Sequence, residues 1–102
     1  MESTTTQKEA FDMLKQMDIA VIQQNLVHYS GSGANPNVLQ LLLKAGLTPN
    51  QSWTSEKGNI FYPLLNAVEN GTAETVGILL NNGADVNILV IKGLSQNFLN
   101  NK

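Results

Sequence analysis

The feature of this sequence that most constrains its fold is an internal repeat at an offset of 37 residues, the separation between Gly46 and Gly83. Apolar positions and turn-forming residues recur in this register. The aligned pairs are Val27 with Leu64, Leu39 with Val76, residues 41–43 (Leu-Leu-Leu) with residues 78–80 (Ile-Leu-Leu), Gly46 with Gly83, and Asn50 with Asn87. Agreement at so many positions in one register indicates two copies of one structural unit, which is the pattern of a repeat protein.

Each copy is predicted to form two short helices joined by a turn. In the second copy, Pro63 suits the first turn of a helix, and Gly71 is expected to end that helix by adopting a positive φ. Thr72 is expected to cap the next helix, which ends at Gly83. The first copy repeats this arrangement with Asn35 as the cap. The apolar stripe of the last helix is predicted to be Val76, Leu79 and Leu80.

The segments that flank and join the two copies carry further signals. Thr6 and Glu9 fit a capping box at the start of an N-terminal helix, and Asp18 is expected to cap a second helix start. Residues 51–60 are predicted to form a polar loop, and residues 88–93 an apolar stretch outside a helix. The apolar contacts of the N-terminal helix are expected from Phe11, Met13, Leu14 and Met17.

The two copies resemble ankyrin repeats. In the second copy, residues 63–64 (Pro-Leu) and 79–80 (Leu-Leu) match the two helices of the family pattern, and residues 83–87 (Gly-Ala-Asp-Val-Asn) match the motif that follows them. The first copy matches at His28, but Asn25 stands where the family usually has Thr. The connection between the copies is longer than usual, so that the offset of 37 residues exceeds the family's period of about 33 residues.

The resemblance implies an all-α fold, a short ankyrin-repeat stack of helix pairs with finger loops. It predicts one small domain over residues 1–102, divided into N-terminal capping helices (1–24), a repeat with an extended finger (25–61), a second repeat (62–90) and a partial C-terminal unit (91–102). The apolar C-terminal end of such a stack needs a cover. A lid formed by Phe98 and Leu99 is the favoured prediction, ahead of a dimer of two chains at this end or a partner protein.

The family implies a protein-binding scaffold whose fingers and first helices meet the partner, which places Gln23, Gln24, Ser32 and Gly33 among the contact positions of this chain. Trp53 joins them because Trp and Tyr are enriched in interface hot spots. An equally open alternative is that Trp53 and Phe61 pack on the stack beneath the finger. The residues predicted to bind the partner are Trp53, Asn59, Phe61, Glu69, Asn70 and Leu89.

The composition argues against several classes of partner and of functional site. With 6 Lys, no Arg and 8 acidic residues, the net charge is −2, which argues against a nucleic-acid partner. No apolar run is long enough to span a bilayer and no secretory signal is visible, so no membrane contact and a cytoplasmic location are expected. The absence of Cys excludes thiolate metal sites. No cofactor, metal ligand or catalytic residue is predicted: His28 is expected to brace a turn, and residues 31–33 (Gly-Ser-Gly) to form an inter-helix turn.

The function predicted from the sequence is a non-catalytic protein-protein interaction module, of the inhibitor or immunity-protein type, that acts by occluding a partner surface. This step rests on family analogy. The alternative is a structural or self-assembling repeat fragment that dimerises or extends through its apolar C-terminal end.

Overall fold

The computed structural model describes residues 5–91 of the chain, and this part is mostly helical. The elements are α1 (Gln7–Gln16), α2 (Gln23–Ser30), α3 (Pro36–Lys44), β1 (Trp53–Thr54), β2 (Ile60–Phe61), α4 (Pro63–Asn70), α5 (Ala73–Asn81) and α6 (Asn87–Ile91). The predominantly helical architecture is therefore confirmed. The predicted loop at 51–60 is wrong in one respect, because β1 and β2 pair there as an antiparallel hairpin. Within residues 5–91, none of the helices has the length and apolar character needed to cross a membrane.

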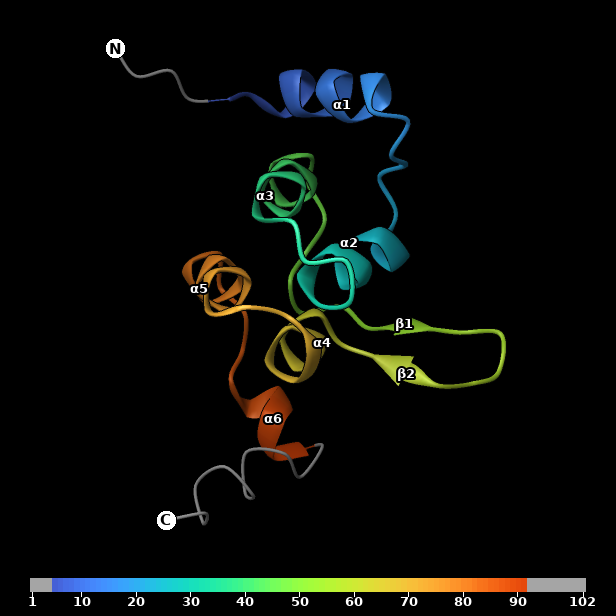
Figure 1. Cartoon of the computed structure of the whole chain (residues 1–102), viewed down its shortest axis with the longest axis vertical. Helices are drawn as coiled ribbons and strands as arrows, with labels where there is room; N and C mark the ends of the chain where they lie inside the picture. The colour runs from blue at the N-terminus through green and yellow to red at the C-terminus, as the bar shows by residue number, and fades with distance from the viewer. Residues whose placement is uncertain (1–4, 92–102) are drawn as a thin grey trace.

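The helices lie in two rows (Figure 1). One row consists of α1, α3 and α5, and the other of α2, α4 and α6, so that α2 packs on α3 and α4 packs on α5. Figure 1 looks nearly along the axes of α2 to α5 but shows α1 from the side, so α1 crosses the end of its row. The hairpin projects from the side of α2 and α4, away from the α1–α3–α5 row.

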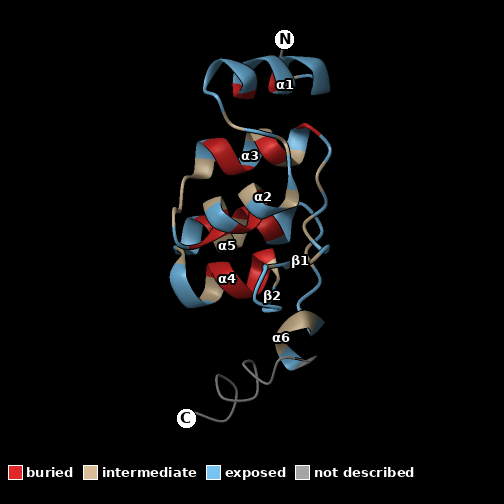
Figure 2. Ribbon diagram, turned by 90° about the vertical axis from the view of Figure 1, so that its right-hand side faces the viewer, coloured by how far each residue is buried: buried red, intermediate tan, exposed pale blue. Residues whose placement is uncertain are grey.

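The core runs through the middle of both rows, as the buried stretches in Figure 2 show. Leu14, Leu42 and Leu79 occupy the same position in α1, α3 and α5, and each is 0% exposed. Fully burying a leucine stabilises the folded state by roughly 1.5–3 kcal/mol. The row thus repeats one buried leucine position three times, although the sequence repeat covers only two of the three helices.

One kind of turn ends α1, α3 and α5. The turn residues Asp18, Gly46 and Gly83 have φ values of 62°, 117° and 93°, in the left-handed region. The amide of the following residue donates to a carbonyl five residues earlier: Ile19 to Leu14 (2.9 Å), Leu47 to Leu42 (3.3 Å) and Ala84 to Leu79 (2.9 Å). This pattern satisfies carbonyls that a helix end leaves without partners. The prediction that Asp18 caps a second helix start was wrong, because Asp18 ends α1 and the next helix begins only at Gln23.

The helix caps predicted at Thr6, Asn35 and Thr72 are confirmed. Thr6 Oγ1 accepts a hydrogen bond from the Glu9 amide at 3.1 Å, and Glu9 Oε1 accepts one from the Thr6 amide at 2.9 Å, which completes the capping box of α1. Asn35 Oδ1 accepts from the amide of Val38 in α3. Thr72 caps α5 by accepting from the Thr75 amide (3.2 Å).

Gly71 ends α4 as predicted, but for a different reason. Its φ is −97°, which other residues adopt freely. What requires glycine is space: a Cβ atom at this position would meet the carbonyl oxygen of Ser30 at the end of α2, and Thr75 Oγ1 at 2.7 Å. Gly71 therefore lets the ends of α2, α4 and α5 approach closely.

The predicted apolar stripes were partly wrong at both ends of the α1–α3–α5 row. In α1, Leu14 and Ala10 are buried, whereas the other side chains predicted to make contacts, Phe11, Met13 and Met17, are 43%, 44% and 46% exposed. In α5 the buried residues are Thr75, Ile78 and Leu79, and Leu80 is 43% exposed. The physical reason is position, because among the helices of residues 5–91 α1 and α5 each have a neighbour on only one side within the row.

The stretch predicted to be non-helical at 88–93 begins as a helix, since α6 spans Asn87–Ile91. α6 follows the turn at Gly83 and packs on α4, as α2 follows the turn at Asp18. The predicted lid residues Phe98 and Leu99, and nearly all of the predicted C-terminal unit, lie outside the described residues.

Candidate functional site

The hairpin between the two helix pairs is built by a short turn. The Gly58 amide donates to the Ser55 carbonyl at 2.9 Å, and the Ser55 amide donates to the Asn59 carbonyl at 2.8 Å. Gly58 has a φ of 87°, as the bulge position of a three-residue hairpin loop requires. In the resulting register Trp53 pairs with Phe61, and Thr54 pairs with Ile60.

The two aromatic residues of the hairpin stack on each other. The ring centroids of Trp53 and Phe61 are 5.5 Å apart, with 24° between the ring planes. Because side chains alternate along a strand, Thr54 and Ile60 take the opposite face, where both are exposed. Trp53 and Phe61 are half-buried, so the outcome lies between the two alternatives left open by the sequence: the pair packs together and still reaches the surface.

Two adjoining hollows meet at this aromatic pair, with volumes of about 630 and 490 Å³. Both are lined by Gln24 of α2 together with Trp53 and Phe61. The first continues along the hairpin past Thr54, Ser55, Glu56, Lys57 and Asn59, and the second continues over α2 and α4 past Asn25, Val27, His28, Tyr29, Ser32 and Asn66. We call the two hollows together the hairpin groove.

The lining of the hairpin groove is aromatic at its centre and neutral at its edges. Most of the polar groups are amides and hydroxyls. Among the described residues, the only acidic side chain and the only lysine of the lining are Glu56 and Lys57, which are adjacent at the hairpin tip. An apolar centre with a polar, hydrogen-bonding rim is typical of protein-protein interfaces. The arrangement offers stacking surface and neutral hydrogen-bonding groups rather than a charged site.

His28 lines the groove, and within residues 5–91 its imidazole makes no bracing hydrogen bond of the kind that the ankyrin resemblance implied. Its imidazole is exposed and meets the Tyr29 ring edge-on, with centroids 4.9 Å apart. The ring also lies where a Cβ atom of Gly33 would be. Asn25 makes the local side-chain bond instead, donating from Nδ2 to the Ala20 carbonyl at 2.7 Å. Residues 31–33 form the turn between α2 and α3, as predicted.

The structure brings together only part of the predicted partner-binding set. Trp53, Asn59 and Phe61 line the hairpin groove, whereas Glu69 and Leu89 lie outside it. Glu69 is exposed near the end of α4, and Leu89 is half-buried against the core. Asn70 reaches the groove indirectly, because its Nδ2 donates to Asn66 Oδ1 at 2.8 Å.

Other residues have roles that sequence reasoning did not assign. Asn66 lines the groove although the family pattern has an apolar residue there, and this polar substitution was the signal that could have found it. Gln23, predicted as a contact position, instead ties α2 to the segment before the hairpin. Its Nε2 donates to the carbonyls of Thr48 (3.1 Å) and Gln51 (2.6 Å).

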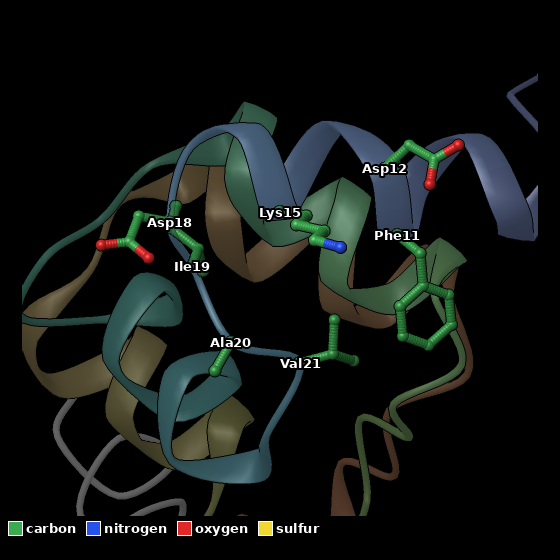
Figure 3. Close-up of a pocket in the computed structure, with 7 residues that line it drawn as sticks. All are labelled: Phe11, Asp12, Lys15, Asp18, Ile19, Ala20 and Val21. Atoms are coloured by element: carbon green, nitrogen blue, oxygen red, sulfur yellow. The ribbon is translucent and has the colours of Figure 1, made fainter.

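A separate hollow of about 510 Å³ lies at the N-terminal end, between α1 and the segment leading to α2 (Figure 3). Phe11, Lys15 and Val21 point toward this space, while the carboxylates of Asp12 and Asp18 point away from it. We call it the α1 hollow. Its remaining lining residues are Ile19 and Ala20. Across residues 5–91, no three His, Asp or Glu side chains gather closely enough to hold a metal ion.

No family model matches the chain, and searches of curated proteins and of solved structures find no match to it.

Proposed function

We propose that this chain is a protein-protein interaction module of the ankyrin-repeat type, without catalytic activity, that binds its partner in the hairpin groove. The observation that carries the proposal is the half-buried stack of Trp53 on Phe61 between two hollows. Hot spots of interfaces are enriched in Trp, and they sit at the centre of a contact that excludes water.

The ankyrin assignment is supported by the way the repeat register coincides with burial and backbone conformation. Leu42 and Leu79, which are 37 residues apart, are both fully buried. Gly46 and Gly83, at the same separation, both have positive φ. A hairpin between successive helix pairs is also the arrangement that the family resemblance implies. Helix pairs with projecting fingers form extended binding surfaces in repeat proteins.

The groove is well suited to a partner with a protruding apolar side chain. Such a group would cover the exposed parts of Trp53 and Phe61, while Gln24 and Asn59 are placed to hydrogen-bond to its backbone. The hairpin register and the contact with α2 hold the aromatic pair before binding, so little ordering entropy is lost. The simplest consequence of binding is steric, because the occupied surface of the partner becomes inaccessible to other molecules.

Capture of partners from an extract of the native host tests this proposal. The chain is immobilised as wild type, as the double variant Trp53→Ala/Phe61→Ala, and as Ile60→Ala. Ile60 is the matched control, because it is 48% exposed on the opposite face of the same hairpin. Loss of a hot-spot aromatic costs about 2 kcal/mol or more of binding, so the double variant should lose capture by at least about thirtyfold. Equal capture by all three proteins contradicts the proposal.

A further inference from the structure

The sequence contains two Asn-Gly pairs, Asn70-Gly71 and Asn82-Gly83, and each pair lies at the end of a helix. Asparagine followed by glycine is prone to spontaneous deamidation, because glycine has no side chain to hinder attack by its own main-chain nitrogen on the asparagine side chain. The reaction requires the glycine amide to leave its hydrogen bond and the backbone between the two residues to rotate. The two pairs are chemically alike, so the fold decides which of them reacts.

Asn70 is protected by its place in α4. The Gly71 amide donates to the Ala67 carbonyl at 2.8 Å, which is a hydrogen bond of the helical type. Asn70 Nδ2 also donates to Asn66 Oδ1 at 2.8 Å, so the side chain is held against the preceding turn of the helix. Gly71 has little room to move, because a Cβ atom at this position would already meet the carbonyl oxygen of Ser30. Reaction at Asn70 therefore requires the end of α4 to separate from α2.

Asn82 lies in a more open turn. It follows the last residue of α5, with a φ of −103° and a ψ of 16°. The Gly83 amide donates to the Leu80 carbonyl at 3.1 Å, three residues back instead of four. Asn82 and Gly83 are both exposed, and a Cβ atom at Gly83 would meet nothing within 4 Å. The backbone of this turn can therefore rotate without separating one helix from another.

We propose that Asn82, and not Asn70, is a site of spontaneous deamidation in the folded protein. The Gly83 nitrogen loses its proton to solvent and bonds to Cγ of Asn82. The bond from Cγ to Nδ2 breaks, and Nδ2 takes up a proton from solvent and leaves as ammonia. Water then opens the succinimide ring at one of its two carbonyl carbons, which gives either aspartate or isoaspartate. One water molecule is consumed for each ammonia released. The inference does not depend on the proposed function.

The reaction weakens the hydrogen bonds that hold this turn. Asn82 Nδ2 donates to the Ile78 carbonyl at 2.8 Å, and a carboxylate in its place cannot donate. The new negative charge lies at the C-terminal end of α5, where the helix dipole disfavours it. The same turn binds Asn50, whose Nδ2 donates to the Gly83 carbonyl (3.0 Å) and whose Oδ1 accepts from the Asp85 amide (2.7 Å). Deamidation should therefore loosen the joint between α5 and the segment that leads to the hairpin.

Ageing of the purified chain tests the assignment. The chain is kept at physiological temperature in mildly alkaline buffer, either folded or unfolded in guanidinium chloride, and is sampled over time. Cleavage after glutamate and lysine places Asn70 in the peptide of residues 70–74 and Asn82 in the peptide of residues 75–92. Mass spectrometry measures the gain of one mass unit in each peptide, and protein isoaspartate methyltransferase labels the isoaspartate product. Asn82→Gln is the control, because its longer side chain cannot close the five-membered ring.

The inference predicts that the 75–92 peptide of the folded chain converts at least about tenfold faster than the 70–74 peptide, because a packed helix end opens less often than an exposed turn. In denaturant the two peptides should convert at comparable rates, and folded Asn82→Gln should leave the 75–92 peptide unmodified. Similar rates in the folded chain, faster conversion at Asn70, or no conversion at all would overturn the assignment. The same tenfold difference in denaturant would also overturn it, because the sequence and not the fold would then select the site.

The effect on the joint is tested with Asn82→Asp, which reproduces one of the two products. Asn81→Asp is the matched control, because it adds the same charge at the exposed last residue of α5 and leaves the bond from Asn82 to Ile78 in place. Asn82→Asp should have the lower melting temperature of the two. Equal melting temperatures would overturn the proposed loosening of the joint.

Discussion

Asn66 Nδ2 donates a hydrogen bond to the carbonyl oxygen of Val27 at 2.7 Å, which joins α4 to α2 across the buried interface between the two helix pairs. Val27 lies in the last turn of α2, where helix carbonyls lack partners, and the nearby Gly31 amide donates to His28 instead. Asn66 is 8% exposed. One amide thus completes the end of α2 and sets the position of the neighbouring helix.

Replacement of Asn66 by leucine should destabilise the fold although it adds apolar surface. The Val27 carbonyl would remain buried without a donor, at a cost of about 1–3 kcal/mol. Asn70→Ala is the control, because it removes only the exposed partner of Asn66 Oδ1 and should cost less than about 1 kcal/mol. Urea unfolding curves measure both. Equal midpoints for Asn66→Leu and wild type would mean that this bond does not support the interface.

Two glycine-to-alanine changes should have opposite signs. At Gly71 a Cβ atom would meet the Ser30 carbonyl oxygen and Thr75 Oγ1, so alanine should destabilise by about 1–3 kcal/mol through overpacking. At Gly77, inside α5, a Cβ atom meets nothing within 4 Å. Alanine there should stabilise the helix by roughly 0.5–1 kcal/mol. Thermal melts of the two variants compare the effects, and shifts in the same direction would contradict the close approach of α2 to α4.

The turns that end α1 and α5 predict a second pair of substitutions with opposite effects on stability. Gly83→Val places a β-branched residue at a φ of 93° and should cost about 1–2 kcal/mol. Asp18→Gly relieves the same backbone conformation at the end of α1 and should stabilise by up to about 1 kcal/mol. Melting temperatures report both changes. A lower melting temperature for Asp18→Gly would show that the Asp18 side chain has a further role.

Phe61→Ala should loosen the hairpin and leave the helices intact. The variant loses a stacked aromatic pair, worth about 0.5–1.5 kcal/mol beyond its buried area. Trp53 is the only tryptophan, so its fluorescence emission should shift to longer wavelength. Hydrogen exchange should speed up at the Ser55 amide, which is bonded to Asn59, and stay slow at Leu79 in the core. Faster exchange at both amides would mean that the hairpin and the core unfold together.

The sequence predicted most accurately those structural features that depend on residues close together in the chain. The caps Thr6, Asn35 and Thr72 were identified correctly because an N-cap side chain bonds to an amide only three residues along the chain. The turn glycine Gly83 was identified for the same kind of reason, because its positive φ is a property of one residue. The repeat register also located the buried leucines of α3 and α5.

The prediction errors arose where a feature depends on contacts between elements that are far apart in the chain. Strands of two residues leave too little alternation to detect, so the pairing of Trp53 with Phe61 was missed. Asp18 carries the residue type of a helix start but adopts the conformation of a helix end. The exposure of Met13 and Leu80 depends on how many helices stand beside α1 and α5, which no local pattern states. Leu89 was expected at a binding surface but packs against the core. This contact also depends on neighbouring helices that no local pattern predicts.

Site-specific photo-crosslinking tests the hairpin groove most directly as the place where a partner binds. A photoreactive amino acid replaces Gln24, which lines both hollows, or Gln40, which is also exposed and lies on α3 outside the groove. The proteins are irradiated in an extract of the native host. The account predicts a discrete adduct with another protein from the probe at Gln24 that is absent with the probe at Gln40 and is lost when Trp53→Ala is added. The same adduct from both positions, or an adduct from Gln40 alone, would contradict it.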